Sequence, residues 1–338
     1  MSPTALEAAL DDELSEPRAD TRAALAACPG DVIVLGAGGK MGPTLARMAR
    51  RAAPDGTRVI AVSRWSSPDA ERALRDAGVE TVSCDLLDRA QLARLPDAPN
   101  VVFMAGQKFG TAGAPSTTWA MNVLVPALCA ERYADARIVA FSTGNVYPLT
   151  PVTGGGSRET DVPAPVGEYA MSCLGRERVF EHSAARHGTR VVLLRLNYAI
   201  DLRYGVLTDL ALRVWRDEPV PLGMGWVNVI WQGDANRLAL EALPLASAPP
   251  FVLNVTGAEA HRVRDLAEAL AERLGRRARF EGEEAPDALL SDTSRLRAHL
   301  APADTTIDTM LDRVAEWVAA GRPLLGKPTK FEERTGTF

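Results

Sequence analysis

The sequence predicts an α/β fold: a doubly wound parallel sheet with helices on both faces, followed by a smaller C-terminal lobe. Short, β-branched apolar runs alternate along the chain with amphipathic helical stretches. The runs are apolar throughout rather than at every second position, as in strands that are covered on both faces. This alternation over most of the 338 residues is typical of a parallel sheet.

Seven segments carry the strand pattern. In chain order they are 31–36, 58–63, 80–85, 100–106, 137–143, 190–197 and 250–257. Helical periodicity follows most of them, over 41–52, 67–78, 88–95, 116–134, 167–187 and 262–275. The last of these helices is closed by Gly275, and a short amphipathic helix is expected near the N-terminus around Leu6, Leu10 and Leu14.

Composition argues against several classes of protein. The net charge is −5, so there is no basic excess to neutralise the phosphates of a nucleic acid. No apolar stretch reaches the roughly 18 residues of a membrane span, and the acidic N-terminus lacks the pattern of a signal peptide. The cysteines (Cys28, Cys84, Cys129 and Cys173) are isolated, and the four histidines lack metal-ligand spacing. We therefore expect a cytoplasmic protein with free thiols, no metal site, no nucleic-acid partner and no membrane association.

A glycine-rich turn follows the first predicted strand. The segment GAGGKMG places Gly36, Gly39 and Gly42 at G-x-x-G-x-x-G spacing and opens a helix. Glycines let the backbone turn tightly and approach a pyrophosphate, whose charge meets the N–H groups at the start of the helix. The strand–turn–helix context predicts a Rossmann-like dinucleotide site, with Lys40 and Met41 of the same loop as cofactor contacts.

The ends of the next strands bear on which dinucleotide binds. Ser63 stands where an NAD site usually carries a carboxylate for the ribose 2′-OH, and Arg64 follows it. Because an arginine pairs with a 2′-phosphate, NADP is expected and NAD is the alternative; an ordinary loop arginine is the rival interpretation of Arg64. Asp85 is placed either to hydrogen-bond the adenine or to cap the next helix. Leu86, Ala105 and Gly106 complete the expected cofactor contacts.

The alternation of predicted strands and helices ends after Asn197, and the expected division into domains follows from that change. Residues 198–250 hold Gly, Pro and Trp without a clear period. The expected parts are an N-terminal helical extension (1–29), a dinucleotide-binding domain (30–200, with 226–257 returning to it), a substrate-binding lobe (201–225 and 258–325) and an extended tail (326–338).

Further motifs stand in a fixed order after the glycine turn. They are CDLLD, FMAG, WAMNVLVPALCA, FSTGNVYP, YAMSC and LRLNYAI. In this order the chain, from about residue 31 to about 320, resembles the extended short-chain dehydrogenase/reductase family, which includes the NAD-dependent sugar epimerases and dehydratases. The resemblance implies hydride transfer between a nicotinamide cofactor and a hydroxyl or carbonyl group of a sugar or sugar derivative.

The same resemblance assigns catalytic residues by matching position. Tyr169 matches the acid/base tyrosine of the Y-x-x-x-K pattern, and Thr143 matches the hydroxyl that positions the substrate oxygen. Cys173 stands where the family keeps its lysine, on the same helix face as Tyr169, so both are expected beside the cofactor. A neutral thiol cannot lower the pKa of a tyrosine by Coulomb attraction, as an ammonium group does.

Three answers to the missing lysine stay open. Lys108, which follows the fourth strand, supplies the positive charge. Alternatively, Tyr169 is weakly activated or a different base acts. In the third case the site is inactive, and the protein is a dinucleotide-binding sensor or scaffold.

The substrate is expected at the start of the smaller lobe. Tyr147 and Asn197 are assigned to it with Thr143 by matching position, and Arg203 is a candidate to hold a phosphorylated group. Asn122, in the helix after the fourth strand, matches an asparagine of the family, and the resemblance implies that it ties down the backbone beside the site. The family often dimerises through the helices after strands four and five, and the apolar runs 119–129 and 170–180 are compatible with a homodimer.

Overall fold

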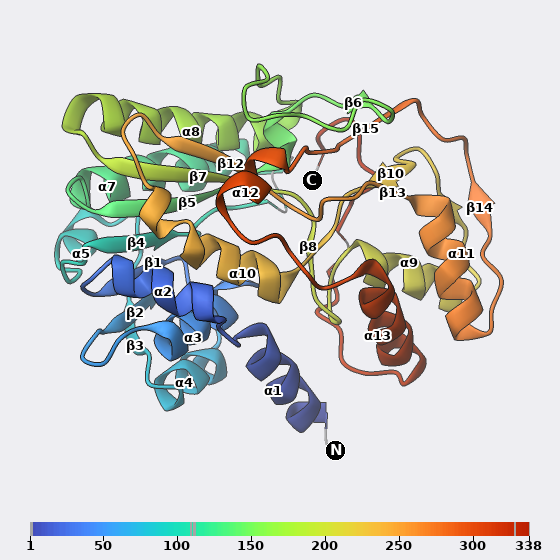
Figure 1. The fold of residues 1–338 in the computed structure, drawn as a ribbon, viewed down its shortest axis with the longest axis horizontal. Helices are drawn as coiled ribbons and strands as arrows, with labels where there is room; N and C mark the ends of the chain where they lie inside the picture. Colours follow the sequence, from blue (N-terminus) through green and yellow to red (C-terminus); the bar gives the residue numbers. More distant parts are fainter. Residues whose placement is uncertain (1–2, 109, 111–112, 328, 338) are drawn as a thin grey trace.

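The computed structural model describes residues 3–108, 110, 113–327 and 329–337, and its centre is one seven-stranded sheet (Figure 1). The strands are β1 (Val32–Leu35), β2 (Val59–Ser63), β3 (Glu80–Ser83), β4 (Asn100–Phe103), β5 (Arg137–Thr143), β7 (Arg190–Leu196) and β12 (Phe251–Val255). They stand in the order β12-β7-β5-β4-β1-β2-β3, and every neighbouring pair is parallel. The predicted fold class is confirmed, and each of the seven predicted strands belongs to this sheet.

The strand order fixes where a ligand is able to bind. The chain runs outward from β1 to β2 and β3, and then crosses back to β4 on the other side of β1. Val32 of β1 therefore lies between Val59 of β2 and Asn100 of β4. At such a reversal the loops after neighbouring strands diverge and leave a crevice at the carboxyl edge of the sheet.

Helices cover both faces of the sheet (Figure 1). On one face lie α2 (Ala19–Ala27), α3 (Gly42–Ala52) and α10 (Gln232–Glu241), which share an apolar cluster with β1 and β2. On the other lie α5 (Arg89–Ala93), α7 (Val125–Arg132) and α8 (Gly167–His187), where Phe180 meets Phe103 edge-on at a centroid separation of 5.5 Å. Burial from both sides explains why the inner strands are apolar throughout, whereas β3 at the edge of the sheet is partly exposed.

The long helix predicted over 116–134 is interrupted. α6 (Pro115–Trp119) gives way to a π-helical turn, η1 (Ala120–Leu124), before α7 begins. Pro126 lacks the N–H group that a continuous α-helix requires there, which favours a local change of hydrogen bonding. Within the π turn, Asn122 donates from Nδ2 to the carbonyl of Gln107 (2.9 Å) and accepts from its N–H (2.8 Å). The expectation that Asn122 ties down this loop is confirmed.

Residues 198–250 are more regular than expected. They contain α9 (Val206–Trp215) as well as α10, and nine of the ten residues of α10 are buried. A helix that is buried on all sides has no amphipathic period, so its sequence pattern does not predict a helix. α9, α11 (Val263–Leu274) and α13 (Ile307–Ala319) form a second apolar cluster with α1 (Pro3–Leu14). The division of the chain into a cofactor domain and a substrate lobe stays a prediction.

The remaining elements are short. They are α4 (Pro68–Asp76), α12 (Ser294–His299), η2 (Gly144–Val146), η3 (Leu243–Leu245) and four strand pairs: β6 (Thr150–Pro151) with β15 (Asp287–Ala288), β8 (Ala199–Ile200) with β11 (Ile230–Trp231), β9 (Val220–Pro221) with β14 (Phe280–Glu281), and β10 (Trp226–Val227) with β13 (His261–Arg262). Among the described residues no helix is long and apolar enough to cross a membrane, and no three His, Cys, Asp or Glu side chains are grouped to hold a metal ion.

The described part of the C-terminal tail packs against the rest of the chain. The N–H and the hydroxyl of Thr329 donate to Asp209 Oδ2 over 2.8 and 2.6 Å, and the hydroxyl of Tyr198 donates to the carbonyl of Phe331 over 3.3 Å. The ring of Phe331 is buried in the second apolar cluster. These contacts bring Thr329 to the crevice at the sheet edge.

Candidate active site

Two adjoining cavities follow the carboxyl edge of the sheet. One has a volume of about 320 Å³ and the other about 310 Å³. Gly36, Gly39, Met104 and Gly106 line both of them, so the two cavities form one groove across the ends of β1 and β4. We name the first the tyrosine cavity, because Tyr169 lines it, and the second the Ser63 cavity.

The glycine turn after β1 leaves room for a ligand. Gly36 has φ +90°, and a Cβ on it would lie 2.5 Å from the backbone nitrogen of Ala105. A Cβ on Gly42 would overlap the carbonyl of Ala37, so α3 packs closely against the turn. A Cβ on Gly39 would meet no atom nearer than 3.6 Å, and Gly39 lines both cavities. The turn therefore fits the backbone approach that a dinucleotide pyrophosphate requires.

The Ser63 cavity brings together the residues that were expected at the adenosine end. Ser63, Arg64, Asp85 and Leu86 line it together with Ala105 and Gly106. The carboxylate of Asp85 accepts from the N–H of Leu87 over 3.0 Å, whereas the N-cap of α5 is Asp88. The helix-cap interpretation of Asp85 is therefore wrong. Arg64 is exposed and makes no hydrogen bond or ion pair with any residue that the structure describes.

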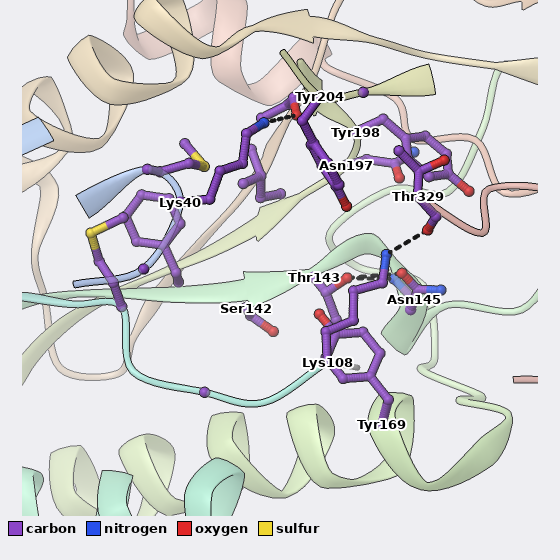
Figure 2. Close-up of a pocket in the computed structure, with 18 of the residues that line it drawn as sticks. Lys40, Lys108, Ser142, Thr143, Asn145, Tyr169, Asn197, Tyr198, Tyr204 and Thr329 are labelled. Carbon is purple, nitrogen blue, oxygen red and sulfur yellow. Dashed lines mark hydrogen bonds between the residues drawn. The ribbon is translucent and has the colours of Figure 1, made fainter. Parts of the chain in front are cut away.

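In the tyrosine cavity, α8 presents Tyr169 and the end of β5 presents Thr143 (Figure 2). Burial raises the pKa of the Tyr169 phenol, and a hydrogen bond with the Thr143 hydroxyl opposes that rise. Thr143 also donates to Asn145 Oδ1 over 3.0 Å. The structure thus brings Tyr169 and Thr143, two of the three residues predicted to be catalytic, into direct contact.

Two lysines enter the same cavity. Lys108 extends beside Tyr169, with Nζ 5.9 Å from the centre of the ring and 3.4 Å from the carbonyl of Thr329 (Figure 2). Lys40 donates to the carbonyl of Ala199 over 3.1 Å and lies 4.3 Å from the ring centre of Tyr204. Burial lowers the pKa of each ammonium group to about 8. Both are therefore mainly protonated at neutral pH.

Cys173 does not reach the cavity wall. Its side chain is 1% exposed and lies in a small apolar cluster with Val146 and Tyr147. Burial raises the pKa of the thiol, so it is neutral at physiological pH. The expected contact between Cys173 and the cofactor is not supported, because its neighbours on α8 and η2 cover it.

Two of the four expected substrate residues lie elsewhere. The hydroxyl of Tyr147 accepts a hydrogen bond from Arg195 Nη1 (2.7 Å) and donates one to Asn254 Oδ1 (2.8 Å), and the residue is 3% exposed. Arg203 is paired with Asp11 (2.8 Å) and Asp201 (3.2 Å). Neither lines the tyrosine cavity. The substrate assignments of Tyr147 and Arg203 are therefore not supported, since the hydroxyl of Tyr147 and Nη2 of Arg203 are already partnered and neither residue lines the cavity.

Asn197 does line the cavity, and its Nδ2 donates to the carbonyl of Leu289 over 3.2 Å. Lining residues that the sequence did not point to include Ser142, Asn145, Arg176, Tyr198, Tyr204 and Thr329. Ser142, Asn145 and Tyr198 lie within motif segments but were assigned no role, whereas Tyr204 lies in a segment without a motif and Thr329 comes from the tail. Arg176 also offered a signal, because it lies seven residues after Tyr169 and so shares its helix face.

This fold and this groove define a protein of the dinucleotide-binding α/β class. A family model described as the NAD dependent epimerase/dehydratase family matches residues 32–200, and the chain belongs to that family. No curated protein sequence matches the chain.

Solved structures share the fold over most of the chain. The UDP-glucose 4-epimerase of Thermotoga maritima with UDP-glucose has a TM-score of 0.72 at 19% identity, covering 86% of this chain and 99% of that one. The UDP-glucose 4-epimerase of Thermus thermophilus with NAD has a TM-score of 0.68 at 22% identity, and the match covers 85% of this chain and 98% of that one. The UDP-glucuronic acid 4-epimerase of Bacillus cereus with NAD has a TM-score of 0.72 at 18% identity, and the match covers 86% of this chain and 99% of that one. At these identities the likeness establishes the fold alone.

Proposed function

We propose that this protein is an NAD(P)-dependent epimerase or oxidoreductase that acts on a hydroxyl or carbonyl group of a sugar or sugar derivative. The observation that carries the proposal is the hydrogen-bonded pair of Tyr169 and Thr143 in a cavity whose wall continues into the glycine turn. Membership of the epimerase/dehydratase family supports it. Relatives of the same fold bind NAD and UDP-sugars, which supports a sugar substrate.

The residues of the groove have separate tasks in this proposal. The turn at Gly36, Gly39 and Gly42 holds the dinucleotide, which supplies the acceptor or donor of a hydride. Thr143 orients the reacting oxygen of the substrate. The phenol oxygen of Tyr169 takes the proton when an alcohol is oxidised and returns it when a carbonyl is reduced. The four free cysteines, all buried, support the proposed cytoplasmic location.

Turnover of a defined panel tests the proposal. The protein is incubated with NAD or NADP and with UDP-glucose, UDP-galactose, UDP-glucuronic acid or free aldoses. Nicotinamide absorbance and chromatography of the sugars then report redox change and epimerisation separately. Conversion that depends on Tyr169 supports the proposal.

A dinucleotide-binding sensor or scaffold without turnover is the second candidate. The neutral thiol at Cys173 and the raised pKa of Tyr169 favour it, because both oppose formation of a phenolate. Tight dinucleotide binding, with no conversion of any sugar in the panel, is its expected signature.

The choice of dinucleotide is expected to depend on Arg64. Because no carboxylate ends β2 and Arg64 has no partner among the described residues, we propose that the site accepts NADP as well as the NAD named in the family description. In Arg64→Ala the dissociation constant of NADP is expected to rise about tenfold, with a loss of ~1.5 kcal/mol for one charged hydrogen bond, while NAD binding stays unchanged. Calorimetric titration with both dinucleotides measures this. Equal losses for NAD and NADP would contradict the role.

Lys108 is expected to make turnover depend on pH. Its pKa is lowered to about 8 by burial, so its positive charge beside Tyr169 is present below pH 8 and is lost above it. The kcat of the wild-type protein should therefore decrease as the pH rises through about 8. In Lys108→Met this falling limb of the pH profile should be absent, and kcat at neutral pH should be lower than in the wild type. Lys40→Met is the control, because Lys40 has the same lowered pKa but contacts Tyr204 instead. If the falling limb disappears in Lys40→Met and persists in Lys108→Met, then Lys40 and not Lys108 causes the pH dependence of kcat.

We also propose a homodimer through α6, η1 and α8. Trp119, Leu124 and Met171 are large apolar side chains there, with exposed fractions of 37%, 46% and 45%. Met171→Glu is expected to shift the protein from dimer to monomer in light scattering, because a charge would be buried at the interface. Val162→Glu is the control, since Val162 is exposed on a loop outside these helices. A monomeric wild-type protein at high micromolar concentration would rule the dimer out.

A further inference from the structure

Position 173, where the family keeps its lysine, lies on α8, and the same helix carries the cation Arg176. We propose that Arg176 supplies the positive charge beside Tyr169 that a lysine at position 173 supplies in the Y-x-x-x-K pattern. This inference rests on the proposed function, since it concerns the same tyrosine. It makes Arg176 a positioning residue that acts through Tyr169.

Helix geometry brings the guanidinium back toward the tyrosine. Residues seven apart share a helix face, and long side chains on a helix lean toward its N-terminus. Arg176 therefore reaches back over the turn that carries Cys173. Both Arg176 and Tyr169 line the tyrosine cavity, and the charge of Arg176 opposes the rise in the Tyr169 pKa that burial causes.

The guanidinium is held in place by hydrogen bonds to two elements, β5 and η1. Nη1 donates to the carbonyl of Phe141 at the end of β5 over 2.7 Å, and Nη2 donates to Asn122 Oδ1 in the π turn over 2.9 Å. A Cβ on Gly106 would overlap Nη2, so the glycine after β4 leaves the space that the guanidinium fills. The residue is 6% exposed. The position is thus built by the packing and is not a surface conformer.

No carboxylate neutralises this charge in the described part of the chain. The neighbouring acid, Glu177, is already paired with Arg195, at 2.7 Å between Oε2 and Nη2 and 3.0 Å between Oε1 and Nε. Nε of Arg176 is buried and has no hydrogen-bond partner among the described residues. An unneutralised charge in a buried site acts on its surroundings more strongly than the same charge in water.

Lys108 is a weaker candidate for this task. Its ammonium group is directed to the carbonyl of Thr329, as Figure 2 shows, and it loses its proton near pH 8. A guanidinium stays charged at every physiological pH. Among the described residues, the groups that face Tyr169 include Arg176 and Cys173 from α8, Thr143 from β5 and Lys108 from the loop after β4. Of these, Arg176 alone is permanently charged.

The test measures ionisation of Tyr169 directly, without turnover. Tyrosine labelled at Cζ gives one carbon signal for each of the five tyrosines, and the signal that is absent in Tyr169→Phe is assigned. In Arg176→Met the ionisation midpoint of Tyr169 is expected to rise by about one pH unit, a tenfold change in the equilibrium. In Arg176→Met with Cys173→Lys the midpoint should return toward the wild-type value, because the lysine restores the charge.

The control removes the same charge from the same helix. Arg178 is 54% exposed and paired with Glu181, so Arg178→Met should leave the midpoint unchanged. Arg176→Gln replaces Arg176→Met if the latter does not fold, and Arg176→Lys should keep the wild-type midpoint. An unchanged midpoint in Arg176→Met, or an equal rise in Arg178→Met, would overturn the inference. Since no substrate is used, a protein without turnover but with the expected midpoints refutes only the proposed function.

A kinetic readout separates this role from a purely structural one. If the sugar panel shows turnover, Arg176→Met should lower kcat at neutral pH about tenfold, because the phenolate of Tyr169 is less stable without the charge. KM for the sugar should stay unchanged, and Cys173→Lys should restore kcat. Loss of kcat together with thermal stability, with no rescue by lysine, would show that Arg176 only supports the fold.

Discussion

Tyr169→Phe is expected to abolish most of the turnover while dinucleotide binding persists. The change removes one hydroxyl, which is the only group of Tyr169 able to exchange a proton with a substrate. Loss of general acid–base catalysis lowers kcat by about 10²–10⁴-fold. Steady-state kinetics on the sugar that the panel identifies, together with titration by NAD, measure both quantities.

Tyr147→Phe is the matched control. The hydroxyl of Tyr147 is buried between Arg195 and Asn254, so its removal leaves polar groups unpaired and should lower the free energy of unfolding by about 1–3 kcal/mol. Turnover should persist because Tyr147 lies outside the tyrosine cavity. Unchanged kcat in Tyr169→Phe would refute the acid/base assignment, and a large loss of kcat in Tyr147→Phe would return Tyr147 to the substrate set.

Gly36→Ala is the second change with a large expected effect. At φ +90° an alanine is strained, and its Cβ would lie 2.5 Å from the backbone of Ala105. The strain and the forced backbone shift should lower the free energy of unfolding by about 2–4 kcal/mol. Displacement of the turn should also abolish dinucleotide binding, because the turn forms the wall shared by both cavities. Urea unfolding and NAD titration measure the two effects.

Gly56→Ala separates strain from crowding. Gly56 has φ +80°, yet a Cβ on it would meet no atom within 4 Å. Its replacement should therefore cost only about 1 kcal/mol for the unfavourable φ and leave NAD binding intact. If Gly36→Ala binds NAD as well as Gly56→Ala does, the glycine turn is not the dinucleotide site.

Much of the fold was predictable from local patterns. The seven strands and the helix at 167–187 follow from apolar runs and helical periodicity, which depend on near neighbours in the sequence. The helices that were missed or interrupted depend on distant packing. α10 is buried all round, and the π turn at Asn122 is stabilised by the loop at Gln107.

The site was predictable where a motif carried it. The glycine turn, Thr143 and Tyr169 stand at the ends of elements whose positions the sheet dictates, and the structure brings them to one groove. The sequence offered no support for placing Tyr147 and Arg203 elsewhere, since nothing near them reveals that Asn254 and Arg195 pair with the hydroxyl of Tyr147, or that Asp11 pairs with Nη2 of Arg203. Partners that lie far apart in the chain are not visible in a local pattern.

The sequence by itself determined the parallel sheet, the glycine turn at its first strand, and the tyrosine without its lysine. Each of these features depends on residues that lie within a few positions of one another in the sequence. Only the tertiary structure decided which charge stands beside that tyrosine. Arg176 reaches it through contacts with Phe141 and Asn122, and Lys108 is directed to Thr329 of the tail. Electrostatic neighbours are set by distance in space, which a linear sequence does not encode directly.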